Sequence, residues 1–209
     1  MEAYQIKIET LTLGAHDLRI RSLLDTNQFD DPEGVAAARG IGEGNWSYFG
    51  QVWSAGRHLA EAMGDFDLAG KRTMEIGCGL ALAGLITHKR HADVTVSDRH
   101  PLAEAFLLAN LALNALPPLP YVDLDWTKAP PSLGRFDLLL ASDVLYEAGH
   151  PLELAHFVED HLESGGEVII VDPGRHRHAT LSRHLRALGL ACTEVRPGGP
   201  TRILHYRAA

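Results

Sequence analysis

Two glycines and a carboxylate stand together at the end of an apolar run, with a spacing that suits ligand binding. The stretch from Met74 to Gly84 contains Glu75, Gly77 and Gly79 in that order. Glycines let a backbone approach a ligand where a Cβ would collide with it, and the helix that follows offers free N–H groups at its start. The pattern predicts a strand that turns into a nucleotide-binding loop. A glycine turn that only joins a strand to a helix has the same composition.

A second carboxylate ends the next apolar run. Val94–Ser97 is rich in β-branched residues and leads to Asp98, about 20 residues beyond Gly77. An acid at this interval can accept hydrogen bonds from both hydroxyls of a ribose. Asp98 would also suit as a cap for a helix that begins near Pro101. We favour ribose binding because the loop and the acid occur together at the expected spacing.

The glycine loop favours S-adenosylmethionine over a dinucleotide. Dinucleotide-binding loops have a third glycine at the position that Leu82 occupies in this chain. We therefore expect nicotinamide and flavin dinucleotides not to bind specifically.

The elements that would position these residues alternate between buried strands and helices. This order is typical of a parallel sheet covered by helices. The patterns predict strands at 71–75, 94–97, 121–123, 136–142, 167–171, 190–195 and 201–207. They predict helices at 82–89, 101–114, 151–163 and 178–188, with turns at 164–166 and 196–200. The expected fold class is α/β, a Rossmann-like, doubly wound, seven-stranded sheet whose last strand is antiparallel.

The N-terminal part differs in pattern from the rest. Segments 4–13 and 18–23 alternate apolar and polar residues and predict an antiparallel β-ribbon, whereas the polar segment 25–44 predicts a surface loop. A helix is expected to open at Gly50 and to run to Met63. We therefore expect an N-terminal extension at 1–49 and a cofactor-binding domain at 50–209.

Two further polar residues follow the predicted strand 136–142. Asp143 and Tyr146 stand just beyond its carboxyl end, where ligands bind in open parallel sheets. Such residues would face the chemistry of a bound ligand. They would also suit as caps for the helix that begins near Pro151.

At this point the chain resembles the class I S-adenosylmethionine-dependent methyltransferases, and more narrowly the seven-strand protein-lysine methyltransferases called methyltransferase family 16. The likeness covers the chain from about Gly50 to the C-terminus. The Asp-x-x-Tyr signature is its most specific part. The segments that carry it are Val52-Trp53, Glu75-x-Gly77-x-Gly79, Leu124-Asp125-Trp126 and Asp143-Val144-Leu145-Tyr146.

The resemblance implies a role for each of these positions. Gly77, Cys78 and Gly79 would wrap the methionine end of S-adenosylmethionine, and Asp98 would hold its ribose. Asp143 would orient the acceptor amine. The other residues with implied roles are Glu75, Trp53, Trp126 and Ser142 at the cofactor, and Tyr146 as a wall or contact of the amine.

One position departs from the family pattern. The family has a further glycine after the Gly-x-Gly pair, and this chain has Ala81 there. Because the added methyl group is small, we expect cofactor binding to survive, with the loop lying farther from the ligand.

The composition of the chain indicates which kinds of ligand and partner are not expected. The chain has 209 residues, a formal net charge of −8 and a pI near 5.8, so an extended phosphate-binding surface and a nucleic-acid partner are not expected. The histidine pairs lack a third ligand nearby, and Cys78 and Cys192 have no metal or disulfide spacing, so no metal site is expected. No apolar run approaches the ~20 residues of a membrane helix, which predicts a cytoplasmic protein without a membrane partner. Residues 175–178 are interpreted as a solvated loop and helix start rather than a docking patch.

Three functions are compatible with the sequence. The first is protein-lysine N-methylation, with a lysine-bearing protein as the partner. The second is N- or O-methylation of a small metabolite, since this fold serves many substrates. The third is a cofactor-binding protein that acts through interaction without turnover, against which the intact Asp143 and Tyr146 argue.

Overall fold

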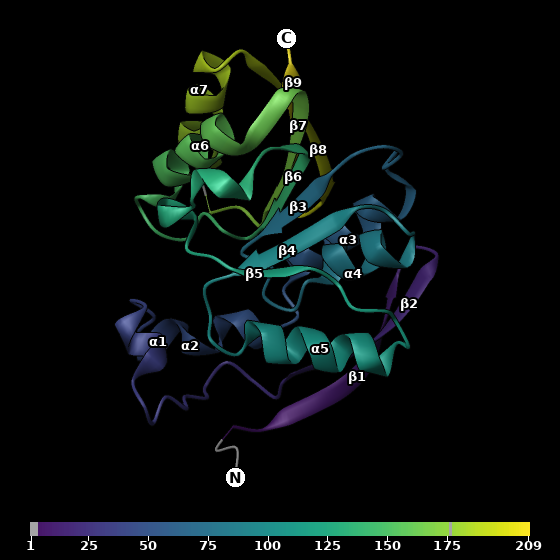
Figure 1. Ribbon diagram of the computed structural model, residues 1–209, viewed down its shortest axis with the longest axis vertical. Helices are drawn as coiled ribbons and strands as arrows, with labels where there is room; N and C mark the ends of the chain where they lie inside the picture. The colour runs from purple at the N-terminus through teal and green to yellow at the C-terminus, as the bar shows by residue number, and fades with distance from the viewer. Residues whose placement is uncertain (1–3, 176) are drawn as a thin grey trace.

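Seven strands form one open sheet at the centre of the molecule (Figure 1). The computed structural model describes residues 4–175 and 177–209. The strand order is β5-β4-β3-β6-β7-β9-β8, and β9 runs in the direction opposite to the other six strands. The strands are β3 (Thr73–Ile76), β4 (Val94–Asp98), β5 (Tyr121–Asp123), β6 (Phe136–Ser142), β7 (Leu162–Asp172), β8 (Leu190–Gly198) and β9 (Thr201–Ala208). The predicted fold class is confirmed.

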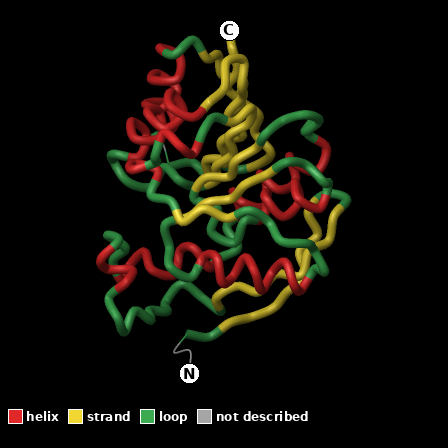
Figure 2. The backbone as a smooth tube through the Cα atoms, in the orientation of Figure 1, coloured by secondary structure: helices red, strands yellow, loops and turns green. Residues whose placement is uncertain are grey.

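Helices cover both faces of this sheet (Figure 2). On one face lie α3 (Ser54–Asp65), α4 (Leu82–Lys89) and α5 (Ala103–Leu113), and on the other lie α6 (His150–His161) and α7 (His178–Ala187). A hydrophobic core lies on each face of the sheet, and the central strand β6 contributes to both because its side chains point alternately to the two faces. Leu138 and Leu140 belong to the first hydrophobic cluster, and Leu139 and Ala141 belong to the second. A strand buried on both faces in this way reads as a continuous apolar run.

The N-terminal ribbon consists of β1 (Ile6–Leu13) and β2 (His16–Leu23), paired antiparallel as predicted. It lies beside α5, away from the main sheet (Figure 1). Its inward residues, among them Leu13 and Ile20, are fully buried in the cluster that α3, α4 and α5 share. The division of the chain at residue 50 stays a prediction.

Asn110 of α5 and Asn114, which directly follows this helix, fasten the ribbon. The Asn110 side chain accepts a hydrogen bond from the Arg21 backbone N–H (2.7 Å) and donates to the Arg21 carbonyl (3.3 Å). Asn114 makes the same pair of bonds with Arg19, both at 2.8 Å. The amides thus take the place of a neighbouring strand and satisfy the free edge of β2.

Some element boundaries differ from the predictions. The predicted turn at 164–166 was wrong as a strand boundary, because β7 runs through it. The strand bulges there instead: Gly165 has φ 79°, and the pairing with β6 shifts between Phe136 and Leu138. The predicted loop 25–44 contains α1 (Val35–Ala38) and the start of α2 (Glu43–Trp46).

The helix expected from Gly50 begins at Ser54, because Gly50 ends the short 3-10 helix η1 (Ser47–Gly50). Two more such turns follow β5, namely η2 (Trp126–Lys128) and η3 (Pro131–Leu133). Within the described part of the chain, every helix is too short or too polar to cross a bilayer. The same residues contain no group of three His, Cys, Asp or Glu side chains placed to bind a metal.

Candidate active site

A pocket opens at the carboxyl ends of β3, β4 and β6, where open parallel sheets bind their ligands. The glycine loop lies between two acidic strand ends there. All the residues predicted to form the site line this pocket: Trp53, Glu75, Gly77, Cys78, Gly79, Asp98, Trp126, Ser142, Asp143 and Tyr146. The structure therefore brings together positions that lie far apart in the sequence.

Both glycines of the loop are required by the geometry. Gly77 and Gly79 have φ 58° and 53°, a left-handed conformation that side chains disfavour. A Cβ on Gly79 would lie 2.9 Å from the carbonyl oxygen of Phe49, and one on Gly77 would lie 3.0 Å from Val144 and 3.1 Å from Trp126. The loop thus packs so closely on its surroundings that only glycine fits.

Ala81 has a left-handed backbone conformation, which glycine adopts more readily than alanine. Its φ is 55° and its side chain is fully buried just before α4. Its N–H donates to the Cys78 carbonyl at 2.7 Å, which closes the loop. An alanine in this left-handed conformation costs about 1–2 kcal/mol. The backbone therefore makes the turn despite the substitution.

Replacing Gly79 with alanine is expected to lower affinity for S-adenosylhomocysteine at least tenfold. The new methyl group must displace the Phe49 backbone, which also borders the pocket. Gly70→Ala is the matched control, because Gly70 has a similar φ of 69° but no atom within 4 Å of its Cβ position. Calorimetry of both folded variants checks the expectation, and equal affinities would contradict it.

Asp98 shapes the loop from the end of β4. One carboxylate oxygen accepts the Gly79 N–H and the other accepts the His100 N–H, both at 2.8 Å. The residue is 9% exposed, and burial raises its pKa. Each oxygen keeps a further lone pair, so Asp98 can still accept hydrogen bonds from a ligand in the pocket.

Glu75 lies deeper, at the end of β3. Its Oε2 accepts the Gly84 N–H at 2.6 Å, and the residue is 2% exposed. Burial raises the pKa of Glu75 to about 8. Gly84 has no room for a side chain, since its Cβ would lie 2.3 Å from Val96. The start of α4 is thus held tightly against the sheet and the acid.

This buried acid should make stability depend on pH. In the fold Glu75 keeps its proton up to about pH 8, whereas the ordinary value is 4.5. The folded state then binds more protons than the unfolded state in this window, so the free energy of unfolding falls as pH rises. Glu75→Gln removes this contribution. Without ligand, the melting temperature of the variant minus that of the parent protein should rise between pH 5 and 8. A difference that stays constant over this range would contradict the argument.

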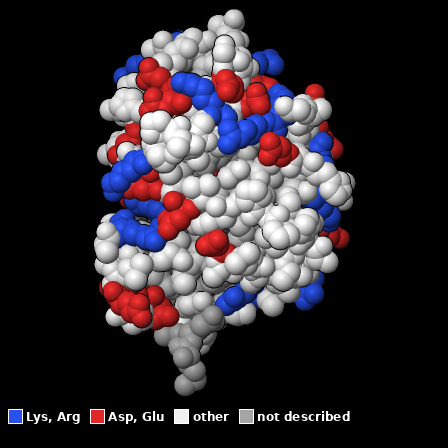
Figure 3. All heavy atoms as spheres, viewed as in Figure 1, with Lys and Arg blue, Asp and Glu red and all other residues white. Residues whose placement is uncertain are grey.

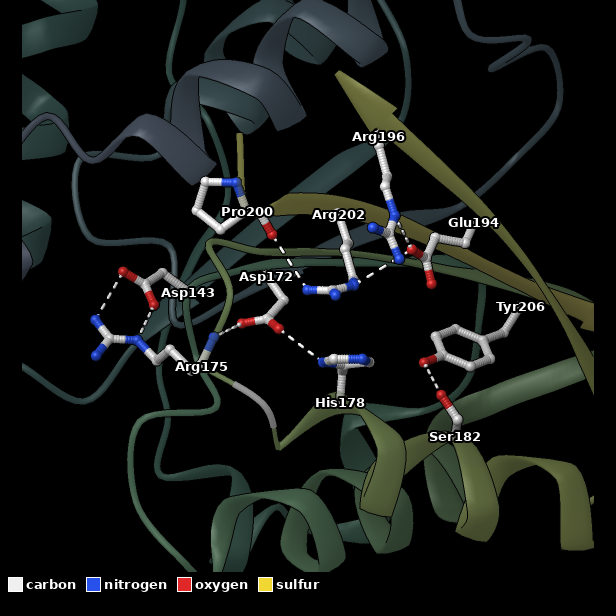
Figure 4. Close-up of polar contacts among 10 residues, drawn as sticks. All are labelled: Asp143, Asp172, Arg175, His178, Ser182, Glu194, Arg196, Pro200, Arg202 and Tyr206. Atoms are coloured by element: carbon white, nitrogen blue, oxygen red, sulfur yellow. Dashed lines mark hydrogen bonds and ion pairs between the residues drawn. The ribbon is translucent and has the colours of Figure 1, made fainter. Parts of the chain in front are cut away.

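Asp143 follows β6 and has an unusual backbone. Its φ is 55°, and its N–H donates to the Val171 carbonyl at 2.9 Å. Such strained residues concentrate at functional sites. Its carboxylate, with 9% of the side chain exposed, forms a two-point ion pair with Arg175: Nε contacts Oδ1 and Nη2 lies 3.0 Å from Oδ2 (Figure 4). The hydrogen bonds to Asp143 raise the pKa of Arg175, so the guanidinium stays charged.

Tyr146 lies beside this ion pair and contacts further aromatic rings. The Arg175 guanidinium lies 5.9 Å from the centre of the Tyr146 ring, and the Tyr48 and Tyr146 rings meet edge to face at 6.0 Å. The Trp53 Nε1 donates to the Tyr48 carbonyl at 2.8 Å. On the other side, the His150 ring lies 4.7 Å from Tyr146. A carboxylate with aromatic neighbours suits a cation.

Several pocket residues were not found from the sequence. Arg175 was interpreted as part of a solvated loop, yet its side chain enters the pocket. Its place just beyond the end of β7 was the signal that could have identified it. Tyr48, Phe49 and His100 also line the pocket. Burial lowers the pKa of His100 to about 3, so its ring, stacked on Phe49 at 3.7 Å, is neutral.

The pocket suits a ligand that is partly apolar and carries positive charge. Five acids and two arginines line it together with several aromatic rings; the acids are Glu75, Asp98, Asp125, Asp143 and Glu153. S-adenosylmethionine offers an ammonium, a sulfonium, ribose hydroxyls and a flat base. The lack of a Cβ at Gly77 and Gly79 lets the loop pack closely on Phe49, Val144 and Trp126, which line the same pocket.

Comparison with known proteins agrees with this geometry. The lysine methyltransferase family model matches residues 42–188. The chain is 33% identical over 165 residues to protein N-lysine methyltransferase METTL21A of Danio rerio, across 74% of this chain and 70% of that protein. It is 32% identical over 106 residues to the histidine protein methyltransferase 1 homolog of Dictyostelium discoideum, across 48% of this chain and 34% of that protein.

A solved structure shares the fold. The magnesium protoporphyrin IX methyltransferase of Synechocystis PCC 6803, solved with bound S-adenosylmethionine, has a TM-score of 0.63 and 16% identity. The likeness covers 87% of this chain and 100% of that one. The family match confirms the predicted family and its cofactor, and the solved structure agrees in fold. The chain belongs to the lysine methyltransferase family and is a class I, S-adenosylmethionine-dependent methyltransferase.

Proposed function

We propose that this enzyme N-methylates a lysine side chain of a protein. The observation that carries the proposal is the carboxylate of Asp143, which lies beside the glycine loop and already pairs with a cationic side chain. A lysine ammonium carries the same charge and would meet the same carboxylate and the same aromatic rings. The family match and the relative that acts on protein lysine support this choice of acceptor.

The proposed division of labour separates the two ligands. Gly77, Cys78 and Gly79 would pass close to the methionine part of the cofactor, and Asp98 would accept hydrogen bonds from its ribose. Glu75 would face its ammonium, which would favour the ionised carboxylate. Trp53, Trp126 and Ser142 would complete this half of the pocket.

The bound cofactor supplies a methyl group on a sulfonium, so the protein must chiefly position the acceptor and exclude water. The amine must also lose its proton before it can attack. At an ordinary pKa near 10.4, deprotonation at pH 7.4 costs about 4 kcal/mol, which burial of the amine lowers. Asp143 would attract the ammonium and then orient the neutral amine by accepting an N–H. Tyr146, which is partly buried, would form the wall beside it.

The charge of the protein supports a protein partner, and its free thiols support a reducing compartment. The net charge is −8, and on the face shown in Figure 3 acidic and basic residues are intermixed without a broad basic area. This arrangement favours a cationic protein segment over nucleic acid. Cys78 and Cys192 are free thiols, as is usual in a reducing compartment, and we propose the cytoplasm.

Transfer of a labelled methyl group into a cell extract tests the proposal. With S-adenosylmethionine labelled on the methyl group and an extract of the source cell, we expect a labelled protein band. Asp143→Asn, prepared in parallel, should give little label. Label in small molecules alone would replace the proposal with metabolite methylation. Absence of label from an enzyme that binds S-adenosylhomocysteine would indicate a binding protein without turnover.

A further inference from the structure

The place proposed for the acceptor amine is taken by a side chain of the enzyme itself. Arg175 makes a two-point ion pair with Asp143 (Figure 4). Its guanidinium also lies over the ring of Tyr146. A planar guanidinium matches a carboxylate in this way better than other side chains do. The pair therefore satisfies both oxygens of Asp143 at once.

The loop that carries Arg175 is held at both ends. Asp172, the last residue of β7 and 1% exposed, accepts the Arg175 N–H at 3.0 Å and pairs with His178 at the start of α7, also at 3.0 Å (Figure 4). Gly174 lies against the turn between β8 and β9, where a Cβ would meet Pro200 at 2.7 Å. These contacts hold the base of the loop, whereas the Arg175 side chain is 35% exposed and contacts Asp143 at its tip.

A second cation competes with Arg175 for Asp143, because two cations beside one carboxylate repel each other. Both carboxylate oxygens are engaged, and only 9% of the Asp143 side chain is exposed. We therefore expect an ammonium that approaches from the pocket to take the place of the guanidinium. The exchange preserves charge, because one cation replaces another on a buried carboxylate, and Arg175 is exposed enough to move into water.

We propose that Arg175 occupies the acceptor site in the resting enzyme and that a cationic acceptor side chain must displace it from Asp143. This inference rests on the proposed role of Asp143 at the acceptor. Arg175 then determines specificity. An ammonium that displaces the guanidinium forms a new ion pair with Asp143, whereas a neutral hydroxyl cannot. The enzyme thus discriminates against uncharged acceptors by leaving the carboxylate unpaired when they enter.

Displacement has a measurable consequence for affinity. When only a fraction of molecules has the site open, the apparent affinity of a ligand falls by that fraction. Arg175→Gln removes the competing charge and should leave the site open. In the presence of saturating S-adenosylhomocysteine, n-butylammonium, which is an analogue of the lysine side chain, should bind this variant at least tenfold more tightly than the parent protein. The neutral n-butanol cannot pair with the Asp143 carboxylate, so it should bind Arg175→Gln at least tenfold more weakly than n-butylammonium does.

Two variants control for folding and charge. Arg183→Gln makes the same change at an exposed arginine of α7, and it should bind n-butylammonium as the parent protein does. Arg175→Lys keeps the charge but loses the two-point geometry, and its affinity for n-butylammonium should lie between the two. Equal affinities of the parent protein, Arg175→Gln and Arg175→Lys, with unchanged melting temperatures, would overturn the proposal.

Kinetics with poly-L-lysine as acceptor separate displacement from positioning. Displacement predicts that Arg175→Gln lowers KM at least fivefold and keeps kcat within about twofold. A tenfold loss of kcat at unchanged KM would show instead that Arg175 positions Asp143, and would overturn the inference. If no variant methylates lysine but Arg175→Gln still gains affinity for n-butylammonium, the lysine proposal fails and the displacement stands.

Discussion

Asp143→Asn is expected to lower turnover by about 100-fold or more while it changes affinity for S-adenosylhomocysteine by less than about twofold. Asparagine keeps the shape of the side chain but removes the charge that would attract and orient an ammonium, and losses of this size are typical when positioning or acid–base contributions are removed. The cofactor would be held by other residues, at the glycine loop and Asp98. Methyl transfer and calorimetry measure the two effects separately.

A surface aspartate provides the control for this substitution. Asp160→Asn changes an exposed side chain of α6 and should leave both quantities unaltered. Turnover of Asp143→Asn near that of the parent protein would mean that the signature at Asp143 and Tyr146 is structural in this chain. If Asp143→Asn lost as much cofactor affinity as Asp98→Ala, Asp143 would bind the cofactor and not the acceptor.

Asp98→Ala should weaken binding of S-adenosylhomocysteine by about 1.5–3 kcal/mol, because it removes charge-assisted hydrogen bonds to the ribose. The structure adds a second cause, since the variant also leaves the N–H groups of Gly79 and His100 without their acceptor. Asp98→Asn retains an acceptor oxygen and should lose less. Calorimetry measures both variants, and unchanged affinity in a folded Asp98→Ala would refute the ribose assignment.

The fold could be predicted because the strands of a parallel sheet leave a strong record in the sequence. The run at β6 is apolar throughout since it is buried on both faces, and its residues divide between two cores. The strand-end rule then placed Asp98 and Asp143 on the same edge of the sheet. Spacing along the chain thus becomes proximity in space.

The partners of these residues were harder to predict. Arg175 is separated from Asp143 by a whole helix and strand, and an arginine in a polar loop looks the same whether it points to water or into a pocket. Tyr48 and Phe49 belong to a segment without clear periodicity, and only its packing on the glycine loop brings it to the site. The bulge at Gly165 was not predicted, because a glycine at that position indicated a turn, whereas β7 runs through it.

The identity of the methylated residue tests the central claim most directly. A protein labelled by this enzyme can be isolated, hydrolysed to amino acids and examined by chromatography and mass spectrometry. If the enzyme methylates a lysine that is held at Asp143, the label should elute as Nε-methylated lysine. Asp143→Asn should abolish this label. Label recovered as methylhistidine or methylarginine, with none in lysine, would contradict the account.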